Sequence, residues 1–202
     1  MVKRVIDIVG SVAGLALLAL PMAIIALAIR LSSPGKAIFR QRRAGRHGLP
    51  FEMLKFRTMR ADADPYGGSP HDKDDPRLTK LGRFLRETSL DELPQLVNVI
   101  KGQMSLVGPR PLYERQAELW DARQRRRLDI RPGVTGYAQV YGRASLTLEE
   151  KIELDLHYVD NASLGMDLRI LLRTIADIFR RRAPTYEQRY SRRQERENDR
   201  KQ

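Results

Sequence analysis

Ser89-Leu90-Asp91-Glu92-Leu93-Pro94-Gln95-Leu96-Val97-Asn98-Val99-Ile100 places two adjacent carboxylates at the start of an apolar helix. Ser89 followed three residues later by Glu92 forms a capping box, so helix capping alone can explain the carboxylates. However, Pro94 lies inside the pattern and denies the carbonyl oxygen of Leu90 its amide partner. Strain beside paired carboxylates is typical of functional sites, so both interpretations stay open. The helix is predicted because apolar residues recur at helical spacing, at Leu93, Leu96, Val97 and Ile100.

The composition points to an anionic partner. The chain has 202 residues, a formal charge of +12 and a pI near 10.3, which suits binding to nucleic acid, acidic lipid or a phosphorylated substrate. The sequence contains no cysteine, which excludes disulfides, thiolate zinc sites and a thiol nucleophile. The three histidines, His47, His71 and His157, match no metal-ligand spacing.

An apolar segment near the N-terminus is long enough to enter a membrane. No charged residue occurs from Val9 to Ile29, and such a helix reaches roughly 30 Å, the thickness of a hydrocarbon core. Pro21 lies near its middle, and basic residues flank both ends. Because basic flanks stay cytoplasmic, a re-entrant hairpin broken at Pro21 fits the pattern. A simple spanning helix is the alternative, since proline also occurs there.

The following residues predict small elements around the carboxylates. Lys55 and Arg57 lie on a strand, where basic side chains are either solvated or in contact with phosphate. Arg86 ends a helix five residues before Asp91. The predicted elements are a β-hairpin of residues 37–43 and 51–59, a surface loop over 61–76 and a short helix over 78–86.

Two prolines fix the backbone on either side of Arg110. A guanidinium held rigidly between Pro109 and Pro111 suits bidentate capture of phosphate. Alternatively, Pro111 simply marks the start of a polar helix over 112–128, with Trp120 as its apolar anchor. Residues 131–137 are expected to form a structured loop.

Two helices and a charged tail are expected at the C-terminal end. Thr147 and Glu150 form a capping box for the first helix. The second helix has a basic face and an apolar stripe, which suits either a membrane interface or core packing. Residues beyond Arg180 are mostly charged or amide-bearing, which predicts a disordered tail, although the mixture of Arg and Glu also allows a solvated helix. The stripe consists of Leu164, Leu168, Leu171, Ile175 and Ile178.

Four motifs follow the membrane segment in a specific order. They are Lys-Phe-Arg-Thr-Met (55–59), Ser-Leu-Asp-Glu-Leu-Pro-Gln-Leu (89–96), Val-Gly-Pro-Arg-Pro (107–111) and Arg-Pro-Gly-Val-Thr-Gly (131–136). Over residues 1–182 the chain resembles the bacterial sugar transferases called monotopic phosphoglycosyl transferases. The resemblance implies an α+β, mostly helical fold. Its parts would be a re-entrant membrane hairpin at 1–35, a cytoplasmic catalytic domain with a small β-hairpin and interfacial amphipathic helices at 36–182, and a flexible charged tail at 183–202.

The resemblance also implies a two-step exchange at phosphorus at the bacterial inner membrane, on its cytoplasmic face. Asp91 would attack the β-phosphate of a UDP-sugar and release UMP, and undecaprenyl phosphate would then accept the sugar phosphate. Glu92 would assist and, with Asp91, hold Mg²⁺. Carboxylates can attack phosphorus, and Mg²⁺ takes one or two carboxylates plus substrate oxygens. Substrate contacts are implied for Arg86, Pro109, Arg110, Pro111 and Asp167.

Two positions depart from the family pattern. Leu20 precedes Pro21 where relatives often have serine, and Tyr141 stands where many have asparagine. The implied partners are membrane phospholipid and, as in larger relatives, a second copy of the chain. Nucleic acid is not expected, because neither a recognition helix nor aromatic stacking platforms are visible. The other classes considered are a membrane-tethered nucleic-acid binder and a non-catalytic membrane scaffold.

Overall fold

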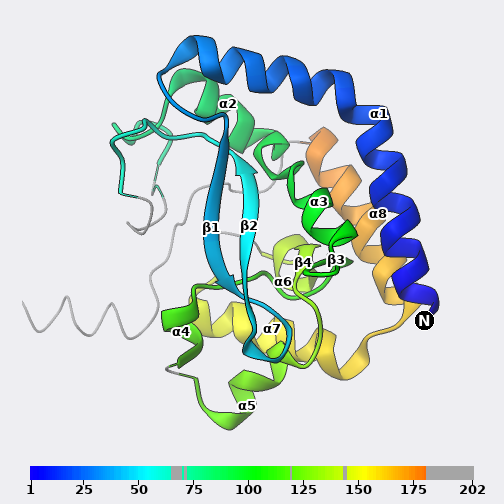
Figure 1. The fold of residues 1–202 in the computed structure, drawn as a ribbon. Helices are drawn as coiled ribbons and strands as arrows, with labels where there is room; N and C mark the ends of the chain where they lie inside the picture. Colours follow the sequence, from blue (N-terminus) through cyan, green and yellow to red (C-terminus); the bar gives the residue numbers. More distant parts are fainter. Residues whose placement is uncertain (65–69, 71, 119, 143–144, 181–202) are drawn as a thin grey trace, which may run out of the picture.

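The computed structural model describes residues 1–64, 70, 72–118, 120–142 and 145–180. In them the chain is mostly helical, with a long apolar N-terminal helix and two small sheets (Figure 1). The predicted tail at 183–202 lies outside the described residues. In chain order the elements are α1 (Val2–Ser32), β1 (Ile38–Ala44), η1 (Arg46–Gly48), β2 (Pro50–Phe56), α2 (Lys80–Glu87), η2 (Leu90–Glu92), α3 (Gln95–Ile100), β3 (Ser105–Val107), α4 (Glu114–Glu118), α5 (Ala122–Arg125), η3 (Arg126–Leu128), β4 (Gly133–Thr135), α6 (Tyr137–Val140), α7 (Leu148–Asn161) and α8 (Leu164–Arg180).

Helix α1 is long and apolar enough to cross a membrane, with a mean hydropathy of 2.6 in its most apolar window. It contains Pro21, and Figure 1 shows that the helix changes direction within its length. Proline is the usual cause of such a bend, because it removes a helical hydrogen bond. The buried residues of α1 are Asp7, Ser11 and Ile29. The re-entrant course of this helix stays a prediction.

The predicted hairpin is confirmed as the antiparallel pair β1 and β2, in which Phe39 lies opposite Lys55. Phe56 at the end of β2 joins Ile29 of α1 and Leu85 of α2 in one hydrophobic cluster. Helix α2 approaches the segment directly after β2 so closely that a Cβ on Gly82 would lie 1.8 Å from the carbonyl oxygen of Thr58. This packing places the end of α2, and the carboxylates after it, beside β2.

A second sheet replaces the loop predicted over residues 131–137. Strands β3 and β4 pair in parallel, with Ser105 opposite Gly133 and Val107 opposite Thr135. A Cβ at Gly133 would lie 2.1 Å from the amide nitrogen of Gly108, so only glycine allows this approach. The sheet thereby fixes the segment that leads from β3 into Arg110.

The helix predicted over 112–128 is divided into α4, α5 and η3. Asp121 forms a capping box with Gln124 and starts a new helix after Trp120, so local capping overrides continuation of the first helix. Trp120 is buried with Ile152 and Leu156 of α7, which confirms its predicted role as an anchor. The capping box predicted at Thr147 is also present.

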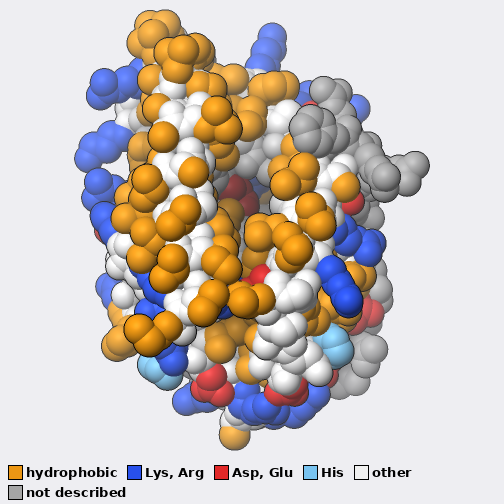
Figure 2. Space-filling model, turned by 90° about the vertical axis from the view of Figure 1, so that its right-hand side faces the viewer, with side chains coloured by type: hydrophobic (Ala, Val, Ile, Leu, Met, Phe, Trp, Pro, Cys, Tyr) orange, Lys and Arg blue, Asp and Glu red, His pale blue; other side chains and the backbone are white. Residues whose placement is uncertain are grey.

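Helices α1 and α8 lie side by side and present hydrophobic side chains on one face of the molecule (Figures 1 and 2). Figure 2 shows that this face is hollowed between the two helices. Most of the predicted α8 stripe is exposed, which is the opposite of core packing. We call this surface the apolar face; its exposed residues include Val9, Val12, Leu17, Leu20, Ile24 and Leu27 of α1 and Leu164, Leu168, Leu172, Ile175 and Ile178 of α8.

Candidate active site

The two carboxylates lie on the short 3-10 turn η2, between α2 and α3. Ser89, directly before this turn, has a left-handed backbone with φ of 58°, which is uncommon for a residue other than glycine. Its side chain makes no capping hydrogen bond, so the predicted capping box is wrong. Pro94 instead separates η2 from α3. The strained turn directs both carboxylates toward distant cationic side chains.

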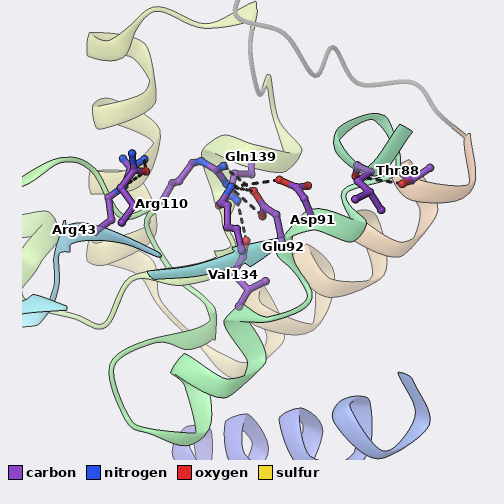
Figure 3. A network of polar contacts seen from close by, with 10 residues as sticks. Arg43, Thr88, Asp91, Glu92, Arg110, Val134 and Gln139 are labelled. Carbon is purple, nitrogen blue, oxygen red and sulfur yellow. Dashed lines mark hydrogen bonds and ion pairs between the residues drawn. The ribbon is translucent and has the colours of Figure 1, made fainter. Parts of the chain in front are cut away.

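Glu92 lies between two cations from different parts of the chain (Figure 3). Its Oε1 is 2.7 Å from the Nζ of Lys55 on β2 and 2.7 Å from the Nη2 of Arg110. Arg110 Nη1 is 3.5 Å from the second carboxylate oxygen, so the guanidinium faces both oxygens. Burial raises the pKa of Glu92, but Arg110 and Lys55 outweigh burial and hold it well below its usual value.

Asp91 is 5% exposed and less directly compensated than Glu92. Its Oδ2 is 3.8 Å from Lys55 Nζ. Burial raises the pKa of Asp91; Lys55, Arg86 and Arg110 oppose that rise, whereas Glu92 adds to it. Two adjacent carboxylates with pKa values shifted in opposite directions are a common arrangement in active sites. Glu92 is therefore the more strongly paired carboxylate of the cluster, and Asp91 is the one with less charge compensation.

Arg110 is held by its backbone as well as by its charge. The carbonyl oxygen of Arg110 accepts a hydrogen bond of 2.9 Å from Arg127 Nη2, and Arg127 forms a buried ion pair with Asp155. Sequence reasoning missed both residues, because a basic run at 125–127 reads as a solvated helix face. The prediction of a rigidly presented guanidinium therefore has a structural basis beyond Pro109 and Pro111.

Lys55 and Asn98 complete the support of the cluster. Asn98 of α3 is buried, accepts a hydrogen bond of 3.0 Å from the amide of Leu54 and donates one of 2.7 Å to the carbonyl of Glu52. Its side chain thus pairs with β2 as a neighbouring strand would. This fixes α3, just after the carboxylates, against the strand that carries Lys55. Lys55 was expected only as a solvated residue or a phosphate contact; Asn98 gave no sequence signal.

The remaining predicted residues occupy two different places. Arg86, at the end of α2, acts electrostatically on Asp91. Asp167 is bonded instead to Lys3, at 2.6 Å, and to the hydroxyl of Tyr158, at 2.5 Å. Its predicted contact with substrate stays a prediction. Gln139 of α6 donates a hydrogen bond of 2.9 Å to the carbonyl of Val134 (Figure 3).

The donor set suits a metal that needs few protein ligands. Among the described residues, no three His, Cys, Asp or Glu side chains gather as a metal site. Mg²⁺ is usually bound through one or two carboxylates plus water and substrate phosphate, which Asp91 and Glu92 could provide. Asp91 fits this role better, because the Glu92 oxygens already face Lys55 and Arg110.

Comparisons with known proteins identify the family of this chain. Residues 1–181 match the family model described as bacterial sugar transferase. The chain is 42% identical to the sugar transferase EpsL of Bacillus subtilis, over 89% of this chain and 88% of that protein. It is 44% identical to a UDP-glucose:undecaprenyl-phosphate glucose-1-phosphate transferase of Caulobacter vibrioides, over 88% of this chain and 69% of that protein. An Escherichia coli transferase of the same name is 40% identical, over 87% of this chain and 39% of that protein. The chain therefore belongs to the bacterial sugar transferase family and is an enzyme that transfers sugar phosphate.

Proposed function

We propose that this protein transfers a sugar 1-phosphate from a UDP-sugar to undecaprenyl phosphate through a covalent intermediate on Asp91. The observation that carries the proposal is the cluster in which the largely buried Asp91, Glu92 and Lys55 meet the partly exposed guanidinium of Arg110. The names of relatives support the overall reaction, since those from Caulobacter vibrioides and Escherichia coli are UDP-glucose:undecaprenyl-phosphate glucose-1-phosphate transferases. Because the acceptor is undecaprenyl phosphate that carries no sugar, this transfer, with release of UMP, would be the first membrane step of polysaccharide or glycoconjugate assembly.

In the first step, a carboxylate oxygen of Asp91 bonds to the β-phosphorus of the UDP-sugar, and the bond from that phosphorus to the oxygen of UMP breaks. In the second step, a phosphate oxygen of undecaprenyl phosphate bonds to the same phosphorus, and the bond to Asp91 breaks. The product is an undecaprenyl diphosphate sugar. Both steps exchange one phosphorus–oxygen bond for another, so they need no net oxidation or reduction.

The residues around Asp91 counter the repulsion between a carboxylate and a diphosphate. Arg110, Arg86 and Lys55 place positive charge around the nucleophile, which lowers the cost of bringing two anions together. Mg²⁺ bound through Asp91, with Glu92 nearby, would neutralise further charge on the diphosphate. Glu92 holds Lys55 and Arg110 in place, because both cations contact its Oε1 at 2.7 Å.

The apolar face explains how one enzyme can meet both a soluble and a lipid substrate. Its exposed leucine and isoleucine side chains on α1 and α8 suit burial in the bilayer boundary. Basic residues flanking α1 suit a re-entrant course with the catalytic domain on the cytoplasmic face of the inner membrane. Membrane phospholipid is then a partner of this face.

Turnover of a panel of UDP-sugars with undecaprenyl phosphate in nanodiscs tests the proposal. We expect UMP release from wild-type protein with at least one sugar, complete loss in Asp91→Asn and a severe loss in Glu92→Gln. Glu52→Gln is a matched control, because Glu52 lies on β2 but its side chain is 57% exposed and pairs with Arg40. Undiminished UMP release by folded Asp91→Asn would refute the assigned nucleophile.

A further inference from the structure

Helix α1 carries one carboxylate that the proposed reaction does not use. Asp7 is the sole acidic residue of this helix and is only 3% exposed. Its Oδ1 accepts hydrogen bonds of 2.9 Å from the Ser105 hydroxyl and of 2.9 Å from the Leu106 amide. A buried charge is costly unless it is bonded in this way, and a charge in a membrane segment is usually there for a function. The bonds of Asp7 attach the apolar helix to β3.

Strand β3 leads directly to the arginine of the site. Beyond Val107, the amide of Gly108 donates to the carbonyl of Thr135 at 2.9 Å, and the amide of Gly133 donates to the carbonyl of Pro109 at 2.9 Å. These bonds make the segment between β3 and Arg110 stiff. Because Arg110 contacts Glu92 at 2.7 Å, a shift of β3 would move the guanidinium relative to the carboxylates.

The C-terminal end of β3, at Val107, is linked to the same helix indirectly, through Asp167 and Tyr158. Lys3 binds one oxygen of Asp167, and the hydroxyl of Tyr158 binds the other. That hydroxyl also lies 3.3 Å from the carbonyl oxygen of Val107. Because the hydroxyl has one proton, its hydrogen bond to the Asp167 carboxylate is the stronger one and its contact with the Val107 carbonyl oxygen is the weaker one. Asp7 therefore makes a more direct polar attachment between α1 and β3 than this indirect link does.

We propose that Asp7 is a positioning residue for the transfer reaction, holding β3 on α1 and so setting the Arg110 guanidinium against Glu92. The inference rests on the proposed function. It also assigns a role to the first turns of α1: through Asp7, the position of this helix determines where Arg110 lies relative to the two carboxylates.

Two substitutions separate hydrogen bonding from charge. Asp7→Asn retains a side-chain oxygen that can accept both bonds, so it should keep kcat/KM for UMP release within about threefold of wild type. Asp7→Ala removes both bonds, and we expect a loss of about 10²-fold, the effect typical of a misplacement near 1 Å. Arg4→Ala is the matched control, because Arg4 donates two hydrogen bonds from the same helix to Val99 and Ile100 of α3 instead.

A double-mutant cycle with Arg110→Ala tests whether Asp7 acts through Arg110. In the Arg110→Ala background, Asp7→Ala should lower kcat/KM by less than about threefold. Arg4→Ala, in contrast, should lower kcat/KM by the same factor with and without Arg110. An Asp7→Ala loss of equal size with and without Arg110 would overturn the inference.

Hydrogen exchange gives a second readout that needs no turnover. In nanodiscs, Asp7→Ala should increase amide exchange over residues 105–110, whereas Asp7→Asn and Arg4→Ala should leave it at the wild-type level. Unchanged protection of these residues in Asp7→Ala would contradict the inference. If wild-type protein released no UMP from any UDP-sugar, the proposed function would fail, and exchange would still decide whether Asp7 holds β3.

Discussion

Replacing Lys55 with methionine should shift the acidic limb of the pH–rate profile. Lys55 Nζ lies 3.8 Å from Asp91 Oδ2, and the side chains are 13% and 6% exposed. Lys55 is the largest of the influences that lower the pKa of Asp91, against a burial effect that raises it. Removing this cation therefore raises the pKa of Asp91 further, and a higher pH is needed to ionise it.

The size of the shift follows from the distance between the two charges. At 3.8 Å, Coulomb's law gives about 1 kcal/mol with the dielectric constant of water and about 4 kcal/mol with an effective value of about 20. Since one pH unit corresponds to about 1.4 kcal/mol, the acidic limb should move upward by roughly one to three pH units. Burial also lowers the pKa of Lys55 itself, against an opposing effect of Glu92, so any alkaline limb due to Lys55 should disappear.

The assay is kcat/KM for UMP release as a function of pH, because this parameter reports ionisations of the free enzyme. Lys55→Arg is the control, since it keeps the positive charge and should keep the acidic limb near its wild-type position. The reasoning is refuted if Lys55→Met lowers the rate equally at every pH, with both limbs unmoved.

Three further predictions concern the support of the site and its metal. Arg127→Met should destabilise the fold by about 3–5 kcal/mol, because it leaves buried Asp155 without its cation; thermal unfolding should show partial recovery in Arg127→Met/Asp155→Leu. Asn98→Leu removes two bonds to β2 and should cost about 1–3 kcal/mol of stability, whereas exposed Ile100→Ala should change unfolding little. EDTA should abolish UMP release, Mg²⁺ should restore it, and undiminished turnover in excess chelator would contradict the expected metal.

The sequence predicts those parts of the fold that depend on local patterns. The apolar segment from Val9 to Ile29, the hairpin around 45–48 and the helix capped by Thr147 each depend on neighbouring residues, and each is present. The parallel pairing of β3 and β4 was missed, because each strand has only three residues. Such pairing depends on close approach of distant glycines, which a single segment does not reveal.

In the candidate site, too, the residues in short local motifs could be predicted, whereas the contacts between distant segments could not. Asp91, Glu92 and Arg110 could be singled out because their motifs are short and contiguous. The capping box at Ser89 fits the local pattern but is absent, because Lys55 and Arg110 bind the carboxylate that would have closed it. The contacts of Asp7 and Arg127 join segments far apart in the sequence, so only the folded chain reveals their roles.

The most direct test of the central claim is mass spectrometry of wild-type protein incubated with its UDP-sugar and Mg²⁺ but without undecaprenyl phosphate. We predict one added sugar phosphate on the peptide containing Asp91, its loss on addition of undecaprenyl phosphate, and no adduct in Asp91→Asn. Complete turnover by wild-type protein with no adduct on this peptide, under quenching that preserves acyl phosphates, would contradict the covalent route.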